Sequence, residues 1–229
     1  MQNFKMKFFL LLVTLTACAA TPQDLTGKMF TFPQETNTAH VRLTTSRQVF
    51  SAITVCHRSF TDVERAHAFF SLATPTTING FMIQKGSASN VVDFFIQNSW
   101  VTIGGQDYKL NIWHSICSTW DSASGLVQLW LDGKPSNRKF ISSGSNINGP
   151  IIIVLGQDQD SYGGGFDSKQ SFVGMMSDVH VWDYIISPCE IKKYMEGPNF
   201  TSGNVLNWKA LEFQTRGRVL VEDKEIICK

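Results

Sequence analysis

Charged residues are scarce in this chain of 229 residues. Asp, Glu, Lys and Arg make up 17% of it, against roughly 25% in an average soluble domain. The formal net charge is +1 and the sequence has no run of like charges, which argues against a nucleic-acid partner held by a broad basic field. The sequence also has no internal repeat and no low-complexity stretch, so a single domain is the simplest organisation.

The local motifs of common enzyme and cofactor sites are absent as well. The sequence contains no G-x-S-x-G, no H-E-x-x-H and no dinucleotide-binding fingerprint, and its five histidines form no local constellation. It has no C-x-x-C pair, which argues against a zinc site or a redox motif. These absences favour a binding protein over an enzyme.

No segment after the first twenty residues is long and apolar enough to cross a bilayer, which needs about 20 apolar residues. Residues 1–20 have the pattern of a secretory signal peptide, because Lys5 and Lys7 precede an apolar stretch and small residues follow it. A competing interpretation takes residues 15–18 as a bacterial lipoprotein box. We expect residues 21–229 to form a secreted, soluble domain.

Four cysteines remain once the predicted signal peptide is removed: Cys56, Cys117, Cys189 and Cys228. An even number in a secreted chain favours disulfides. Four cysteines allow three pairings, and their spacing does not choose among them.

Strand patterns dominate the rest of the chain. Residues 126–131 are mostly apolar and precede Asp132-Gly133, a strong hairpin signal. Residues 179–182 alternate with period two, residues 151–155 form an apolar run, and Asn79-Gly80 suggests another turn. The spacing of these strands predicts an all-β sandwich.

One short helix is predicted after Ser187. Ser187 is a typical N-cap, Pro188 suits the first helical position, and Glu190 completes a capping box in which both side chains bond free amides. Gly197-Pro198 should end the helix, with the glycine in a left-handed conformation. The residues expected on its buried face are Ile191, Tyr194 and Met195.

The segment from 156 to 170, GQDQDSYGGGFDSKQ, follows the apolar run and is rich in oxygen-bearing side chains. Calcium prefers six to eight oxygens from carboxylates, amides, carbonyls and water. The glycines at 163–165 let the segment fold back on itself. It is therefore a candidate calcium site, in which the side-chain oxygens come from Asp158, Asp160, Asp167 and Gln170.

The segment admits other interpretations. An EF-hand fails, because Tyr162 and Lys169 occupy positions that need oxygen ligands. A glycosidase pair of Asp158 and Asp160 needs one carboxyl protonated by burial, and a wet, polar loop gives no reason for a raised pKa. A solvated surface loop rich in turn-forming residues stays open on composition alone.

The segment Cys117–Ser122, CSTWDS, resembles the pentraxin signature His-x-Cys-x-Ser/Thr-Trp-x-Ser/Thr. The chain as a whole resembles the short pentraxins, the family of C-reactive protein and serum amyloid P component. Because this is an animal family, the resemblance favours a signal peptide over a lipoprotein box. The matching segments are 30–33, 53–56, 130–135, 155–164, 182–183 and 204–208.

The resemblance implies a flattened jelly-roll of two antiparallel sheets with one helix on one face, and a cyclic pentamer. It implies a disulfide between Cys56 and Cys117, and two calcium ions per protomer that bridge to anionic or phosphorylated ligands. By position, the ion ligands are Asn79, Asp158, the carbonyl of Gln159, Asp160, Asp167 and Gln170. Complement is a possible partner of the helix-bearing face.

Several positions depart from the family pattern. Ser115 stands where the signature has histidine, with His114 one residue earlier. Ile78 replaces an acidic ligand and Asp158 replaces a glutamate, so we expect at least one ion to bind more weakly. The remaining cysteines lie outside the family core: a Cys189–Cys228 disulfide is one interpretation, an intersubunit bridge another, and a reactive Cys189 thiol at the helix N-terminus a third.

The phosphocholine pocket known in the family is altered here. Its aromatic wall falls at Gln84, and its acid falls near Ser99-Trp100. Met82 and Phe95 can form an apolar ledge, and Trp100 either offers a ring face to a cation or is an ordinary core tryptophan. Asn199 begins an N-glycosylation sequon, Asn-Phe-Thr.

The sequence thus predicts a secreted, calcium-dependent recognition protein of innate immunity and the acute phase that binds phosphorylated or acidic surfaces. Avidity from a ring strengthens weak single contacts. The alternatives are a calcium-independent lectin or scaffold of the same fold, made plausible by Ile78, and a jelly-roll glycan hydrolase.

Overall fold

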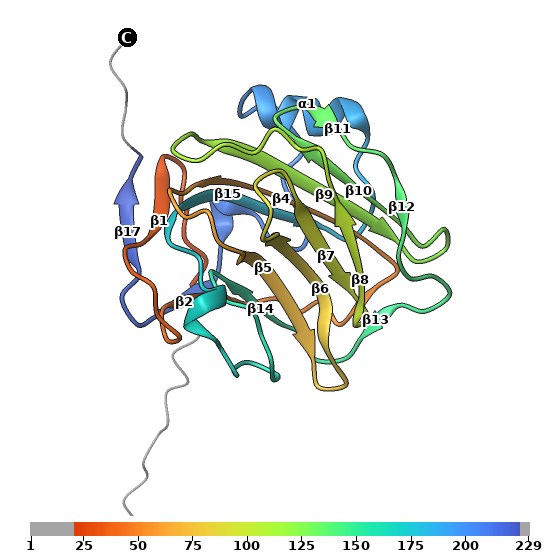
Figure 1. Cartoon of the computed structure of the whole chain (residues 1–229), viewed down its shortest axis with the longest axis horizontal. Coiled ribbons are helices and arrows are strands. Elements are labelled where there is room, and N and C mark those ends of the chain that lie inside the picture. The colour runs from red at the N-terminus through yellow and green to blue at the C-terminus, as the bar shows by residue number, and fades with distance from the viewer. Residues whose placement is uncertain (1–20, 225–229) are drawn as a thin grey trace, which may run out of the picture.

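Two antiparallel β-sheets are stacked face to face in the computed structural model, which describes residues 21–224 (Figure 1). The eight-stranded sheet has the order β11-β10-β9-β4-β15-β1-β17, with β12 also paired to β10. Its strands are β1 (Lys28–Phe32), β4 (Ala52–Phe60), β9 (His114–Asp121), β10 (Leu126–Leu131), β11 (Lys134–Pro135), β12 (Lys139–Phe140), β15 (Gly174–Trp182) and β17 (Leu220–Asp223).

The seven-stranded sheet has the order β16-β2-β14-β5-β6-β7-β8. Its strands are β2 (His40–Leu43), β5 (His67–Thr74), β6 (Thr77–Lys85), β7 (Val92–Ile96), β8 (Ser99–Ile103), β14 (Ile152–Leu155) and β16 (Phe213–Arg216). A separate pair joins β3 (Val49–Phe50) to β13 (Ile147–Asn148). The 3-10 turns are η1 (Ser168–Gln170) and η2 (Trp208–Ala210), and α1 (Pro188–Glu196) is the α-helix of the described residues.

Apolar side chains from the inner faces of both sheets form the core. Leu43, Ile153, Leu72, Phe81 and Ile96 lie side by side across five neighbouring strands of the seven-stranded sheet, and all of them are buried. Because side chains alternate between the faces of a strand, their chain neighbours point to the outer face. The predicted all-β sandwich is confirmed, and this alternation decides which residues are available to a ligand.

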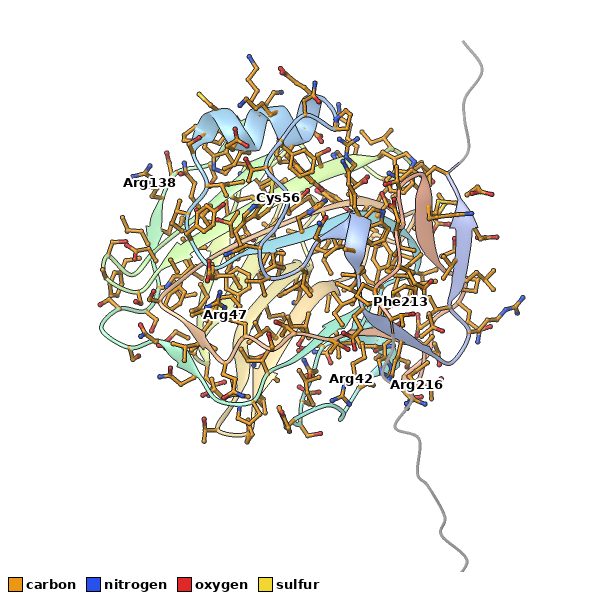
Figure 2. All side chains as sticks on the ribbon, turned by 180° about the vertical axis from the view of Figure 1, so that it is seen from behind. Arg42, Arg47, Cys56, Arg138, Phe213 and Arg216 are labelled. Carbon is orange, nitrogen blue, oxygen red and sulfur yellow. A yellow bond between two sulfur atoms is a disulfide. The ribbon has the colours of Figure 1, made fainter. Side chains whose placement is uncertain are left out.

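The disulfide between Cys56 and Cys117 is confirmed. The two cysteines lie directly opposite each other on β4 and β9. Their sulfurs pack on the outer face of the eight-stranded sheet beneath α1, in a cluster with Trp182, Ile191 and Tyr194. The covalent link therefore joins the two strands that carry the helix, on the side away from the acidic segment (Figures 1 and 2).

The helix begins as predicted but ends differently. The Ser187 hydroxyl accepts a hydrogen bond from the amide of Glu190 at 3.2 Å. The Glu190 carboxylate does not complete a capping box; it accepts from the amide of Thr201 at 2.9 Å and from the ammonium of Lys193 at 2.7 Å. Gly197 has φ 169°, an extended conformation, so the expected left-handed cap is wrong.

The turn expected at Asn79-Gly80 is also wrong, because both residues lie inside β6. The connection between β5 and β6 is earlier, where Thr74 faces Thr77. A side chain at position 80 would come within 3.0 Å of Leu72. The glycine here permits close packing of two strands and does not form the expected turn.

Candidate calcium-binding face

The acidic segment, residues 156–170, lies on the outer face of the seven-stranded sheet. Gln159 fixes it there: its side-chain amide donates to the carbonyl of Ser71 on β5 at 2.9 Å and to the carbonyl of Ile152 on β14 at 3.2 Å. Its side-chain oxygen accepts from the amide of Gly163 at 3.0 Å. Gln159 is fully buried, so the middle of the segment is held as firmly as a core residue.

The glycines fold the segment back as predicted. The amides and carbonyls of Ser161 and Gly164 exchange two hydrogen bonds, at 3.1 and 3.0 Å, across a tight hairpin. Gly163 and Gly165 have φ of 81° and 75°, a left-handed conformation that glycine adopts without strain. The fold-back places Gln170 against Asp158, where the Gln170 amide donates to Oδ2 at 3.2 Å.

Asp158 is almost fully buried, with 5% of its surface exposed. Its Oδ1 is buried without a hydrogen-bond partner. Burial and, to a lesser extent, the charge of Asp160 raise the pKa of Asp158 from 3.8 to about 6. The expectation that this carboxyl sits in a wet loop with an unperturbed pKa is therefore wrong.

The other two carboxylates belong to the same negatively charged site. Asp160 and Asp167 are exposed, but partial burial and then the charge of Asp167 raise the pKa of Asp160. Asp167 caps η1, where its Oδ1 accepts from the amide of Lys169 at 3.0 Å. The charge of Asp160 thus raises the pKa of Asp158, and the charge of Asp167 raises that of Asp160, which is a repulsion that a bound cation would relieve.

Asn79 lies on β6, one strand beyond the Ser71 contact of Gln159, and its side-chain oxygen is also buried without a hydrogen-bond partner. No three carboxylate, histidine or cysteine side chains within residues 21–224 group closely enough to hold a metal by themselves. Amide and main-chain oxygens would have to complete the site, and calcium accepts both. The orphaned oxygens of Asp158 and Asn79 fit that ion.

A row of side chains leads away from the acidic segment along the outer face. Ser71, Met82, Phe95 and Trp100 face one another in sequence across β5, β6, β7 and β8. Met82 is 1% exposed and Phe95 is half-buried, whereas Trp100 is 63% exposed. Trp100 is therefore not a core tryptophan. Of the predicted ledge of Met82 and Phe95, Met82 is buried and only Phe95 is partly accessible, with Trp100 beside it.

Gln84 lies one step further along β6 on the same face, half-buried, opposite Ala68 and Asp93. It offers an amide where the family pattern has an aromatic wall.

Sequence reasoning missed the residues that hold the acidic segment in place. Ser71 anchors Gln159, and the amide of Gln157 donates to the carbonyls of Thr36 and Ala39 at 2.6 and 2.9 Å. Ser71 is one serine in an apolar strand, and only its pairing with β14 and β6 shows that it lies beneath the acidic segment.

Comparison with known proteins decides the family. The chain matches the Pentaxin family over residues 28–223. It belongs to the pentraxin family. C-reactive protein of Sus scrofa is 36% identical to this pentraxin over 95% of the chain and 97% of its own length. Serum amyloid P-component of Mus musculus is 37% identical over 88% of the chain and 89% of its own length.

A solved structure agrees with the fold. A heptameric SAP-like pentraxin from Limulus polyphemus superposes with a TM-score of 0.80 at 25% identity and covers 87% of this chain and 96% of its own. The family consists of recognition proteins that are not enzymes, so this pentraxin is a recognition protein, and the glycan-hydrolase alternative falls with that result.

Other predictions stay predictions. The signal peptide at residues 1–20 and Cys228 lie outside the described residues. Cys189 is exposed on α1, and Asn199 is exposed after it. Within residues 21–224, no helix has the length and apolar character needed to cross a membrane.

Proposed function

We propose that this pentraxin is a secreted, calcium-dependent pattern-recognition protein of innate immunity and the acute phase. Its ligands are phosphorylated or acidic groups on microbial or damaged-cell surfaces. The observation that carries the proposal is the buried, unpartnered oxygen of Asp158 within a group of mutually repelling carboxylates. Burying the Asp158 charge beside the exposed carboxylates of Asp160 and Asp167 is costly unless a cation compensates it.

The residues that would hold two calcium ions are those named from the family pattern: Asn79, Asp158, the carbonyl of Gln159, Asp160, Asp167 and Gln170. Calcium in such a site keeps coordination positions open for phosphate or carboxylate oxygens. Gln159 and the glycine hairpin fix the positions of the carboxylates. The half-buried Ile78 supplies no oxygen beside Asn79, so one of the two sites is the weaker.

Phe95 and Trp100 form the adjoining apolar subsite, supported by Met82 and flanked by Gln84. The indole ring of Trp100 gives a flat surface for an apolar or cationic part of a ligand, worth about 0.5–2 kcal/mol for a cation. We expect Trp100→Ala to weaken binding of phosphocholine while leaving the free energy of unfolding unchanged, because the side chain is mostly exposed.

We further propose that the chain forms a closed ring, with a pentamer as the expected size. Phe140 on β12 is 63% exposed at one edge of the eight-stranded sheet, and Leu220 and Val221 on β17 are exposed at the opposite edge. Two different apolar edges on one sheet suit a head-to-tail contact, in which one edge of a protomer packs against the opposite edge of the next. Such contacts close into a ring when the rotation between neighbouring protomers permits.

The remaining family features belong to the same proposal. The face that carries α1 would be free to bind host effectors such as complement, because it lies opposite the acidic segment (Figure 1). Residues 1–20 would direct secretion, Asn199 would carry a glycan, and Cys189 would pair with Cys228.

The test is retention on a phosphoethanolamine resin, together with calorimetric titration of calcium. We expect retention at millimolar calcium, release by EDTA, and no retention of Asp158→Asn. Asp107→Asn is the matched control, because Asp107 is exposed and, among the residues that the structure describes, its carboxylate forms an ion pair only with Lys109, at 3.3 Å. Retention in EDTA, or no heat on adding calcium, would favour the calcium-independent scaffold and refute the proposal.

A further inference from the structure

Two arginines stand on the same outer face as the acidic segment, on the side away from Trp100. The row of paired residues that contains Met82 and Trp100 continues in the other direction from Ser71 to Val154 on β14 and Arg42 on β2. Arg42 and the neighbouring Arg216 are exposed. The outer face is therefore cationic on one flank of the acidic segment and aromatic on the other.

The pairing of β2 with β16 holds the two arginines together. Arg42 faces Gln214 and His40 faces Arg216, so the arginines are diagonal neighbours, roughly 7–8 Å apart along the sheet surface. Figure 2 shows them on one side of the molecule, well separated from Arg138. The Arg216 guanidinium donates to the side-chain oxygen of Gln214 at 3.2 Å, which helps to hold it over the strand.

Neither arginine is neutralised by an acid. Among residues 21–224, no carboxylate lies within salt-bridge distance of Arg42 or Arg216. Arg47, by contrast, is paired with Asp183. Burial lowers the pKa of His40, and the charges of Arg216 and Arg42 lower it further. The two guanidinium groups thus form an uncompensated positive patch.

The acidic segment contacts His40, the residue paired with Arg216 on the neighbouring strand. The ring of Phe166 packs against the ring of His40 with centroids 4.8 Å apart. Arg42 lies two strands from Ser71, the anchor of Gln159, which is roughly 10 Å at the usual strand spacing. A ligand held at the acidic segment therefore has a second cationic contact about 10 Å away.

We propose that Arg42 and Arg216 form a second anion-binding subsite, which selects acidic polysaccharides whose negative charges are widely spaced. The inference extends the proposed function, since one charge of the chain would sit at the acidic segment and the next at the arginines. Guanidinium groups bind carboxylates and sulfates in a bidentate manner. The ligand class is a glycan with about one acidic group per disaccharide.

A nucleic acid fits this face less well. One strand carries a phosphate about every 3.4 Å, so it would place phosphates between the two subsites, over Val154, which offers them no positive charge. Glu212, half-buried directly before β16, where its carbonyl accepts from the amide of Thr44 at 3.0 Å, would repel a dense polyanion as well. A chain with sparse charges avoids both contacts.

The experiment measures binding of a hyaluronan octasaccharide and a neutral chitin oligomer to the full-length protein in calcium. R42Q/R216Q is compared with R138Q/K192Q, which removes the same charge from exposed positions elsewhere. We expect R42Q/R216Q to lower hyaluronan affinity by roughly tenfold or more, because two exposed charge contacts are lost. The dependence of hyaluronan binding on salt concentration should also become weaker. Phosphoethanolamine binding should be unchanged in R42Q/R216Q, which also shows that the variant is folded.

Equal hyaluronan affinity of the two double variants would overturn the inference. An oligonucleotide that binds as tightly as hyaluronan, and loses affinity equally in R42Q/R216Q, would overturn the ligand class. A wild-type protein that fails to bind phosphoethanolamine in calcium would refute the proposed function instead. The two failures are therefore distinguishable.

Discussion

Replacing Asp158 by asparagine should stabilise the protein in the absence of calcium and abolish its stabilisation by calcium. The pKa of Asp158 is about 6 in the folded state, against 3.8 for the ordinary group. Because the pKa is about two units higher in the folded state, the ionised form of Asp158 destabilises the folded state by about 3 kcal/mol. An asparagine removes that charge, but its own buried amide is left unpartnered, which costs about 1 kcal/mol of stability. The expected net gain is about 2 kcal/mol at pH 7.5 in EDTA.

The pH dependence gives an independent check on this reasoning. Between pH 4 and pH 6 the folded state binds the Asp158 proton more tightly than the unfolded state does, so its contribution to stability is lost as pH rises through this range. The advantage of Asp158→Asn over the wild-type protein should therefore shrink on going from pH 7.5 to pH 5. Comparing the two proteins cancels the histidines, which titrate in both.

The assay is urea unfolding followed by tryptophan fluorescence, in EDTA and in millimolar calcium. Calcium should stabilise the wild-type protein in proportion to the logarithm of its concentration above the dissociation constant, and should have little effect on Asp158→Asn. Asp107→Asn should behave as the wild-type protein does. A variant that is no more stable than wild type in EDTA, or that keeps the full calcium effect, would show that the Asp158 charge is not the element that calcium compensates.

Three further predictions concern the rest of the molecule. Reduction of the Cys56–Cys117 disulfide, whose cysteines are 61 residues apart, should cost about 4 kcal/mol of unfolding free energy in the loop-entropy account; an unchanged urea midpoint would contradict it. His57 is buried with both ring nitrogens unpartnered, and burial lowers its pKa from 6.5 to about 3. The unfolded state therefore takes up this proton first, stability should fall by about 2 kcal/mol between pH 7 and pH 5 from this group, and His57→Leu should show a shallower fall in the same titration. Phe140→Asp and Leu220→Asp should each shift the sedimentation profile toward monomers, and a ring that survives both changes would rule out the proposed edge contact.

Much of the fold follows from local patterns. The strand at 126–131 and its Asp-Gly hairpin, the N-terminus of α1 and the all-β class are all visible in the order of residues, because alternation and capping act over a few positions. The Asn79-Gly80 turn was wrong for the same reason. A turn-forming pair and a glycine that permits close strand packing look alike until the neighbouring strand is known.

The candidate site was predictable in its residue types but not in its environment. The oxygen-rich segment can be recognised by its composition. The burial of Asp158, however, depends on Ser71, which anchors the neighbouring Gln159 and lies far away in the chain. Exposure of Trp100 was equally undetermined, since the strand in which it lies is at the edge of the sheet and its outward face has no covering layer.

The sequence by itself determined the class of fold, the family with its disulfide, and the segment rich in oxygen ligands that suit calcium. Each of these can be recognised from residues close together in the chain or from a family pattern. Only the tertiary structure decided that Arg42, Ser71, Met82 and Trp100 form one continuous row beneath and beside that segment. The physical reason is strand register: a shift of one residue in the pairing would turn each of these side chains to the opposite face.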